Sequence, residues 1–359
     1  MISIISKSTI ITNVLRVLSL FVFLVMWSNP GEAADPIRMR FANHHTAQHP
    51  MTAISKQYLA ELEAASKGTV VIEYHGAEAL GKHSEQYDMT KEGLADISTL
   101  TTAYYPAKFQ LVSFVELPFF STSSRASYDV VRALVDKKLL ATEFDDVRHL
   151  VVVMSPPNQI FSNKKITKVE DFKGMRFLCQ GTVWPKAMSA LGSQCVSMGI
   201  TDVYLALQRG TLDAASISWA SVKSYRWVEV AKYPMDLSFM GGYCSTVIMN
   251  NKSWSRLSPE VQTEWLKISE KYGQRFAAIF DGADKANKAI WAAAGKPIET
   301  LPDAEMKRLA KTLEPVWLDW INRMEKAGKP GKEVYMTYVE TMKKNGQPVL
   351  MKLPGLYKD

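Results

Sequence analysis

The side chains best suited to chemistry are histidines, amides and aromatic rings that stand near the ends of expected strands. His44 and His45 are adjacent, so in a strand their rings would point to opposite faces. His75 and His83 flank a loop. Because metal ligands normally come with acidic or Cys partners at set spacing, we do not expect these histidines to form a metal site.

The common motifs of enzymes are missing from the sequence. It contains no G-x-S-x-G, H-E-x-x-H or C-x-x-C pattern, and no G-x-G-x-x-G follows an expected strand. We therefore expect a protein that is not an enzyme and that needs no cofactor. The amide and aromatic residues at strand ends favour a binding site instead.

Three cysteines, Cys179, Cys195 and Cys244, allow at most one disulfide. Their spacing matches no metal-binding pattern. We expect small buried thiols, since free Cys is commonly buried. A bridge between Cys179 and Cys195 is the alternative.

The composition is that of a globular protein with more than one core. A chain of 359 residues exceeds one ordinary domain, and its 47% hydrophobic and 22% charged residues exclude a disordered or fibrous chain. The formal net charge is +7, but basic and acidic residues alternate, as in Lys56, Glu61 and Lys67. Because no basic stripe with interleaved aromatic residues is present, we do not expect a nucleic-acid partner.

Residues 1–34 read as a secretory signal peptide. Lys7 and Arg16 precede the apolar run Val17–Trp27, which is shorter than the roughly 20 residues that span a bilayer. Small residues follow, and they suit cleavage after Ala33 or Ala34. An uncleaved anchor is the alternative, and we expect an exported, periplasmic protein.

The first part of the mature chain predicts an α/β lobe with helices against a mostly parallel sheet. The expected strands are Ile37–Ala42, Thr69–Tyr74, Ile97–Leu100 and His149–Met154, and the expected helices are Pro50–Ser66, Ser84–Glu92 and Ser124–Val135. Two prolines in Ser155–Asn158 end the last strand, so we expect a crossover between lobes there.

The next part repeats this alternation. Strands are expected at Met175–Cys179, Gln194–Met198 and Ala214–Ser218, and helices at Pro185–Leu191, Asp202–Gln208 and Ala220–Lys232. A Gly-x-x-Asp sequence precedes a strand in both parts, at Gly93–Asp96 and at Gly210–Asp213. Glycine closes a helix where a left-handed residue is needed. The echo therefore indicates two lobes of similar build.

The last part connects the lobes. Cys244–Asn250 reads as a strand that returns to the first lobe, and Ser258–Gly295 as a helix that would exceed roughly 50 Å at 1.5 Å per residue. Helices are also expected at Asp303–Ala327 and Lys332–Asn345. We assign residues 35–155 plus 244–283 to lobe I, and 156–243 plus 284–359 to lobe II. Ligands of such folds bind at strand ends and between domains.

Several stretches resemble the solute receptors of tripartite ATP-independent periplasmic (TRAP) transporters, the DctP-like family. Val169–Phe177 is similar to the family's D-x-K-G-x-K-x-R segment, and D-V-Y-L-A-L-Q-R-G-T-L-D at Asp202–Asp213 is the most specific match. Further matches, in the same order along the chain, are Arg40–Asn43, Gly93–Ile97, Glu116–Phe119 and Glu229–Tyr233.

The resemblance implies the periplasmic-binding-protein fold: two α/β lobes, a cleft between them, and a long helix that spans both. It implies a receptor that closes on a small solute, mostly an organic acid, and delivers it to a sodium-driven TRAP permease. A monomer is the family's common state. In the family pattern an Arg pairs bidentately with the ligand carboxylate.

The sequence departs from the family pattern at that Arg. Leu178 stands in its place, and Arg176 stands where the family has the preceding Lys. Strand alternation puts both on one face, so Arg176 either substitutes for the missing Arg or is a surface or hinge residue. A second family position, sometimes Arg, is Asn158, and Thr101 and Tyr104 occupy polar contact positions.

These departures predict a ligand that is less acidic, or more aromatic or hydroxylated, than a dicarboxylate. Asn43, Asn158 and Gln180 can bond hydroxyl or carbonyl groups. Trp184, Trp219 and Tyr243 can cover an apolar ring. Core packing is the alternative for each Trp.

His44 can supply the missing positive charge near or below pH 6.5. A sensor that presents its ligand to a membrane signalling protein is an alternative function, because such a receptor could have the same sequence features. A periplasmic enzyme on the same scaffold is a further alternative.

Overall fold

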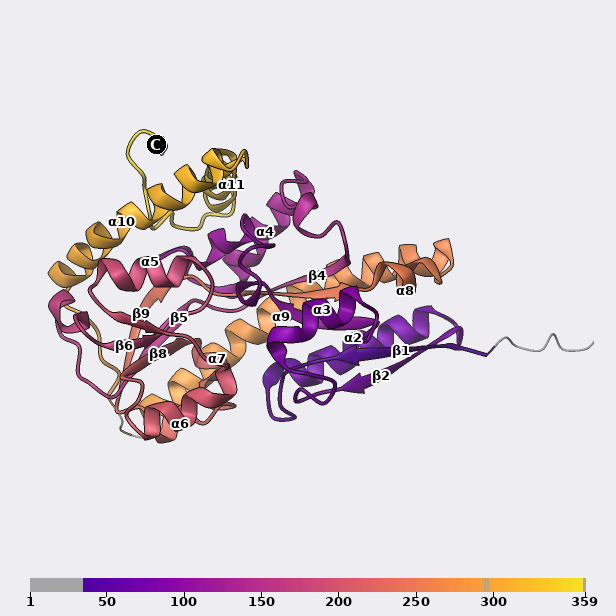
Figure 1. Cartoon of the computed structure of the whole chain (residues 1–359), viewed down its shortest axis with the longest axis horizontal. Coiled ribbons are helices and arrows are strands. Elements are labelled where there is room, and N and C mark those ends of the chain that lie inside the picture. The colour runs from indigo at the N-terminus through magenta and orange to yellow at the C-terminus, as the bar shows by residue number, and fades with distance from the viewer. Residues whose placement is uncertain (1–34, 294, 296, 358–359) are drawn as a thin grey trace, which may run out of the picture.

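The computed structural model describes residues 35–293, 295 and 297–357. The expected signal peptide, residues 1–34, lies outside this part of the chain. The described residues form two five-stranded sheets, and each sheet is the centre of one lobe (Figure 1). None of the described helices combines the length and the hydropathy that a membrane crossing needs.

The sheet of lobe I has the strand order β2-β1-β3-β10-β4. Its strands are β1 (Ile37–Ala42), β2 (Val70–His75), β3 (Ile97–Thr101), β4 (Arg148–Met154) and β10 (Cys244–Met249). β1 pairs parallel with β2 and β3, whereas β10 is antiparallel to both β3 and β4. Four of the five strands therefore run in the same direction, which confirms the expected mostly parallel sheet, and the returning β10 is inserted antiparallel between β3 and β4.

The sheet of lobe II has the order β7-β6-β8-β5-β9. Its strands are β5 (Asn158–Ser162), β6 (Arg176–Leu178), β7 (Gln194–Val196), β8 (Ala214–Ile217) and β9 (Tyr233–Met240). β6 pairs parallel with β7 and β8, and β5 pairs antiparallel with β8 and β9. β5 and β9 were not expected: β5 begins directly after two prolines, and β9 contains Pro234.

Short helices cover the sheets. Lobe I carries α2 (Pro50–Ala65), α3 (Gln86–Lys91), α4 (Ser124–Asp136) and α8 (Asn251–Ser255), and lobe II carries α5 (Val183–Ala190), α6 (Val203–Gln208) and α7 (Trp219–Val222). Of the helix expected over Ala220–Lys232, only the first residues are confirmed, as part of α7. Arg226 has a left-handed φ of 61°, which ends the helical path before the 3-10 turn Trp227–Glu229.

One long helix, α9 (Pro259–Ala293), runs along both lobes (Figure 1). The indole Nε1 of Trp265 donates to the carbonyl of Leu62 in lobe I at 2.9 Å. Near the other end, the ring centroid of Trp291 lies 5.8 Å from that of Trp219 in lobe II. The expected helix spanning both lobes is confirmed, so α9 holds both lobes on one rigid element.

The C-terminal helices, α10 (Asp303–Lys326) and α11 (Gly331–Lys344), also touch both lobes: α10 packs against α5, and α11 against α4. Trp317 Nε1 donates to Pro118 O at 2.8 Å. α11, assigned to lobe II, thus packs on a helix of lobe I, and the exact lobe boundaries remain a prediction.

The Gly-x-x-Asp echo corresponds to the same local structure in both lobes. In lobe I, Asp96 Oδ2 accepts from Arg40 N at 2.8 Å, and Arg40 Nη2 donates to Gly93 O at 2.9 Å. In lobe II, Asp213 Oδ2 accepts from Arg176 N at 2.9 Å, and Arg176 Nη2 donates to Gly210 O. We call these pairs the Arg–Asp clamps. Each ties an Arg of a central strand, in the second half of β1 or at the start of β6, to the turn that enters the neighbouring strand.

Candidate functional site

A cavity of about 80 Å³ lies between the lobes. Lobe I contributes residues that follow β1 and β3, and lobe II contributes residues at the ends of β6 and β8. Phe280 of α9 forms part of its wall. Among the described residues that line the cavity, none is Lys, Arg, Asp or Glu. The cavity thus has no fixed charge in its lining.

Four histidines of lobe I line one side of the cavity, and we call them the histidine stack: His44, His45, His49 and His83. The ring centroids of His44 and His83 are 3.4 Å apart with an interplanar angle of 8°. His44 and His45 are 4.0 Å apart, and His45 and His49 are 3.9 Å apart. The rings therefore form one continuous group.

Three local structures bring these rings together. His44 and His45 follow β1 after the single residue Asn43. His49 caps the N-terminus of α2, where its Nδ1 accepts from Met51 N at 3.2 Å. His83 opens the 3-10 turn His83–Glu85, and its backbone N donates to Glu78 Oε1 at 2.9 Å.

Burial keeps the histidine stack neutral. It lowers the pKa of His44, His45 and His83 well below 6.5, and the neighbouring imidazoles lower them further. Burial alone lowers the pKa of His49 to about 3. Within the described part of the protein, the Nδ1 atoms of His44 and His45 and both ring nitrogens of His83 have no hydrogen-bond partner.

Hydroxyl groups form another part of the wall. Thr101 of β3 and Ser245 of β10 face each other in register, with their Oγ atoms 2.8 Å apart. Ser221 of α7 lies 3.1 Å from His49 Nε2, a contact between the lobes. The Oγ of Ser218 is buried without a partner among the described residues. These groups can bond oxygen atoms of a solute.

Apolar and aromatic residues form the rest of the wall. Apart from Tyr104 of lobe I and Phe280 of α9, these residues come from lobe II: Leu178, Ile200, Ile217, Tyr225 and Tyr243. Such side chains suit the body of a small ring-bearing solute. Polar groups on one side and apolar groups on the other can fix a ligand's orientation.

A direct hydrogen bond joins the lobes at the cavity. Gln180 Nε2 donates to the hydroxyl of Tyr104 at 3.0 Å. Tyr104 ends the 3-10 turn after β3, and its ring meets His83 edge-on with centroids 4.7 Å apart. Gln180 follows β6. This bond therefore links the histidine stack to the ligand-facing strand of lobe II.

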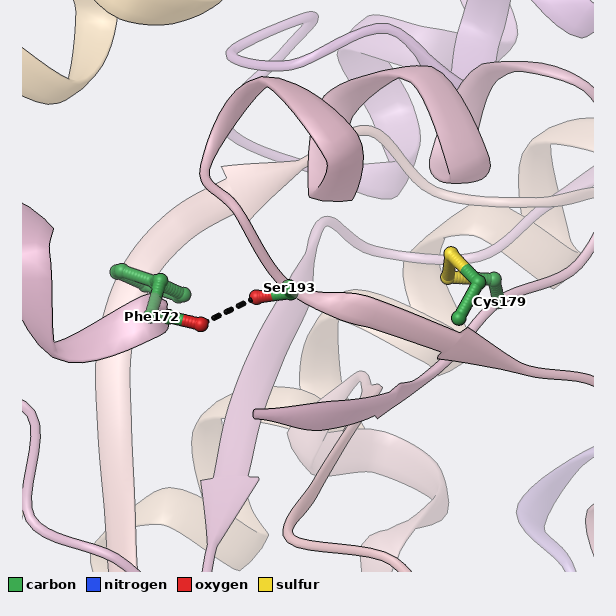
Figure 2. Close-up of a disulfide and its surroundings, with 4 residues drawn as sticks. Phe172, Cys179 and Ser193 are labelled. Atoms are coloured by element: carbon green, nitrogen blue, oxygen red, sulfur yellow. Dashed lines mark hydrogen bonds between the residues drawn. A yellow bond between two sulfur atoms is a disulfide. The ribbon is translucent and has the colours of Figure 1, made fainter. Parts of the chain in front are cut away.

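Cys179 and Cys195 form a disulfide, with Cα atoms 5.3 Å apart, so the expectation of free thiols there is wrong (Figure 2). The bridge joins the end of β6 to β7, where Phe177 pairs with Cys195. At the other end of β7, Ser193 Oγ donates to Phe172 O at 2.7 Å. Cys179 lies between two lining residues, so the bridge anchors this wall of the cavity. Cys244 is a buried free thiol, as expected.

The family described as "Bacterial extracellular solute-binding protein, family 7", named DctP, matches residues 41–323, well over half of the chain. The chain belongs to this family. Its role as a solute receptor, with a TRAP permease as the implied membrane partner, follows from that membership. DctP is a family of receptors, not of enzymes.

Individual relatives are distant but cover most of the chain. The C4-dicarboxylate-binding periplasmic protein DctP of Rhodobacter capsulatus is 23% identical over 274 residues, which are 76% of this chain and 79% of the relative. A TRAP solute-binding protein of a marine metagenome, specific for aromatic acid ligands and solved with 3-hydroxybenzoate, has a TM-score of 0.80 at 23% identity, covering 86% of this chain and 98% of its own.

A TRAP solute-binding protein of Rhodoferax ferrireducens T118, solved with copurified benzoate, has a TM-score of 0.78 at 22% identity. The match covers 86% of this chain and 98% of that one. At this level of identity the two structures establish the shared two-lobe fold.

The structure brings most of the predicted site residues to the cavity wall. Those that line it are His44, Thr101, Tyr104, Asn158, Leu178, Gln180 and Tyr243. Asn158 is 1% exposed, and its Nδ2 donates to Gly241 O at 2.9 Å.

Arg176 does not line the cavity, which corrects the idea that it replaces the family's Arg. Its Nε and Nη2 donate to the two carboxylate oxygens of Asp213 at 3.0 and 2.9 Å. The guanidinium holds the pKa of Asp213 well below its usual range. Both groups are thus used in the lobe II clamp, and Arg176 sits at the far end of β6 from Gln180.

Asn43, Trp184 and Trp219 also lie outside the lining. Asn43 Oδ1 accepts from His45 N at 2.9 Å, so Asn43 shapes the turn that carries the stack. Trp184 stacks on the lining residue Tyr243 at 5.8 Å. Trp219 packs edge-on against Phe161 in the core of lobe II. These residues support the wall from behind.

Sequence reasoning missed His45, His49 and His83 as a group. The run H-H-x-x-x-H from His44 to His49 was a usable signal, because His residues are otherwise sparse in the chain. His83 offered none, since it reaches the stack only through the fold. No group of His, Cys, Asp or Glu among the described residues is arranged to hold a metal ion.

Proposed function

We propose that this receptor binds a small aromatic or hydroxylated monocarboxylic acid in the interlobe cavity. The observation that carries the proposal is the lining itself. It has no fixed cation among the described residues, a polar side made of the histidine stack and hydroxyls, and an apolar side that includes Leu178, Ile217 and Phe280. The aromatic acids held by the metagenomic and Rhodoferax proteins add support.

In this proposal the acid group lies against His44, Thr101 and Ser245, where nitrogen and hydroxyl groups converge on the cavity. The ring lies against Leu178 and Phe280. A C4-dicarboxylate would place a second carboxylate against these apolar groups without a partner, which costs free energy. The site is therefore selective for one acid group.

Isothermal titration calorimetry tests the selectivity. The probes are benzoate, 3-hydroxybenzoate, succinate and neutral benzyl alcohol. We expect 3-hydroxybenzoate to bind at least about tenfold more tightly than succinate, which corresponds to about 1.4 kcal/mol. Tight binding of succinate with no binding of the aromatic acids would overturn the proposal. Mass spectrometry of protein purified without refolding identifies any copurified acid.

We also infer that the chain is exported, loses residues 1–33 or 1–34, and acts in the periplasm as a monomer whose lobes close on the ligand. The apolar run Val17–Trp27 supports the export signal. The intact mass of the secreted protein and light scattering of the purified protein test these points. A mass that retains Met1 would contradict cleavage.

A further inference from the structure

The histidine stack is unusual because it is polar, buried and incompletely bonded. Its side chains are almost fully covered: His44 is 7% exposed, His45 5%, His49 3% and His83 6%. The ring nitrogens without partners among the described residues belong to His44, His45 and His83, all of which line the cavity. Buried nitrogens without partners cost free energy, which a bound ligand can recover.

An organic anion in this cavity has no fixed positive charge beside it among the described lining residues. A carboxylate removed from water needs a cation or several hydrogen-bond donors, and the described lining offers no Lys or Arg. A neutral imidazole donates one hydrogen bond, whereas an imidazolium donates two and supplies charge. A protonated imidazole of the histidine stack, next to the anion, would provide that positive charge.

Resting on the proposed function, we propose that the receptor takes up one proton onto the histidine stack when it binds an organic acid anion. The anion and the proton then enter the cavity together, and the loaded site is neutral. His44 and His83, the closest stacked pair, are the two rings that can carry it, because each has a ring nitrogen without a partner among the described residues. Such a site holds acids without the permanent cation that an Arg would provide at Leu178.

Other titratable groups surround the stack. Those on the elements packed against it are Glu78, Asp202, Asp284, Tyr104, Tyr225 and Tyr243, with Lys82 and Glu85 exposed beside His83. Burial raises the pKa of all three tyrosines, so they stay neutral hydrogen-bond donors. The Glu78 side chain accepts a hydrogen bond from the backbone N of His83.

The sign of the pH dependence follows from linkage. In the empty receptor the histidine pKa values lie well below 6.5, and an adjacent anion raises them in the complex. Affinity for the anion therefore increases as the pH falls between the two values, by about tenfold per pH unit for one proton. It levels off below the empty-state pKa and is weakest above the complex-state pKa.

Calorimetry of the full mature receptor at one pH in phosphate and in Tris tests the inference. The two buffers differ in ionisation enthalpy, so the difference in observed binding enthalpy gives the number of protons taken up. With 3-hydroxybenzoate near pH 7 we expect about one proton per ligand, as linkage requires for one site. Binding without proton uptake would overturn this inference and leave the proposed function intact. Absence of binding by any aromatic acid would overturn both.

A sulfonate separates a proton on the protein from a proton on the ligand. Benzenesulfonate stays ionised at every accessible pH, so it takes up a proton only if the histidines hold it. We expect similar proton uptake with benzenesulfonate and benzoate. The ¹³C shift of carboxyl-labelled benzoate should be that of a carboxylate in the complex, and the shift of a protonated acid would contradict the assignment to histidine.

Variants of the histidines test which side chains take up the proton. His44→Asn and His83→Gln should each lower the proton number and flatten the dependence of affinity on pH. His149→Gln is the matched control: His149 is half-buried, burial lowers the pKa of its imidazole to about 4, and it packs against Phe144 of lobe I, outside the cavity lining. Folded His44 and His83 variants, verified by circular dichroism, that retain full proton uptake would overturn the inference.

Discussion

The two lobes share a backbone framework and differ in the side chains that this framework directs toward the cavity. Arg40-Phe41-Ala42 in lobe I aligns with Arg176-Phe177-Leu178 in lobe II, and in both Arg–Asp clamps the Arg backbone N donates to the Asp carboxylate and Nη2 donates to the Gly carbonyl. Phe41 pairs with Ile97, and Phe177 pairs with Ala214, the residues that follow the two clamp aspartates. The frameworks therefore match residue by residue.

Beyond the strand ends the lobes diverge. Lobe I continues into Asn43 and His44 and the histidine stack, whereas lobe II continues into Cys179 and Gln180 and a disulfide. His44 and Gln180 occupy equivalent places, and both line the cavity. A repeated clamp thus positions two strand ends, and each lobe then supplies its own kind of group: titratable in lobe I, apolar and amide in lobe II.

The clamps should differ in strength, and removing the carboxylate tests this. Asp213 accepts from Arg176 through the backbone and both guanidinium nitrogens, and Lys164 Nζ lies 3.0 Å from it. Asp213→Ala leaves these donors unpaired, and we expect a loss of about 3–5 kcal/mol in the free energy of unfolding. Urea denaturation measures it.

Asp96→Ala is the matched variant in lobe I. The closest guanidinium contact of Asp96, from Arg40 Nε, is 3.6 Å, so its loss should be smaller, about 1–3 kcal/mol. Because the pKa of Asp213 is lowered, its contribution is present above about pH 4 and is lost as the pH falls through the folded-state value. A larger effect at Asp96 would contradict the ranking.

The disulfide is the second difference between the lobes. Replacing both cysteines, Cys179→Ser with Cys195→Ser, should lower the free energy of unfolding by about 3 kcal/mol, the expected value for a loop of some 15 residues. Affinity for 3-hydroxybenzoate should fall as well, because Leu178 and Gln180 flank Cys179. Denaturation and calorimetry measure the two effects.

Dithiothreitol should reproduce both effects in the wild type. Cys244→Ala is the control, since Cys244 is a free buried thiol, and the effect of the reductant should persist in that variant. An unchanged affinity in the double Ser variant would show that the bridge stabilises lobe II without positioning the cavity wall.

Part of the fold of both lobes could be predicted from the sequence. The alternation of apolar residues located β1, β3, β4 and α9, and the family motifs located the fold. β5 and β9 were missed because prolines at their starts weaken the local signal for a strand. Local sequence patterns predict elements that have their own periodicity. They do not predict strands that form only through tertiary pairing.

The role of Arg176 was left open between two alternatives for a related reason. Its role depends on Asp213, a contact that crosses from β6 to the turn before β8. The signal was present in the sequence, because R-F precedes both strand ends and Gly-x-x-Asp follows in both lobes. Gln180 and Tyr104 were predicted from strand ends and family positions. The histidine stack forms only when three separate segments meet in the fold, and no local pattern predicts that.

A buried carboxyl where the lobes meet provides a third test. Glu116 is 1% exposed, and a side chain on Gly181 of lobe II would collide with its Oε2. Burial raises the pKa of Glu116 to about 8. Because the folded-state value is raised, its contribution is full below the unfolded pKa and is lost as the pH rises through 8, by at most about 1.4 kcal/mol per pH unit.

Glu116→Gln should remove this dependence while it preserves the volume of the side chain. Urea denaturation at pH 5, 6.5 and 8 measures the slope in the variant and in the wild type. Glu92→Gln, at an exposed position after α3, is the control and should retain the wild-type slope. A wild-type slope that survives in Glu116→Gln would assign the pH dependence to another group.

The smallest expected effect concerns the bond that joins the two lobes. Tyr104→Phe removes the hydroxyl that accepts from Gln180 Nε2 at 3.0 Å. A neutral hydrogen bond contributes about 1 kcal/mol, so affinity for 3-hydroxybenzoate should fall about fivefold if the bond forms only in the closed receptor. Titration calorimetry measures the affinity.

Tyr105→Phe is the matched control, because the hydroxyl of Tyr105 donates to Ser84 O at 2.5 Å within lobe I. Its loss should reduce stability and leave affinity unchanged, since both partners move together when the lobes open. Equal losses of affinity in the two variants would mean that the Tyr104–Gln180 bond contributes nothing specific to closure. The histidine stack of lobe I and the residues after β6 of lobe II would then be linked only by contacts with the ligand.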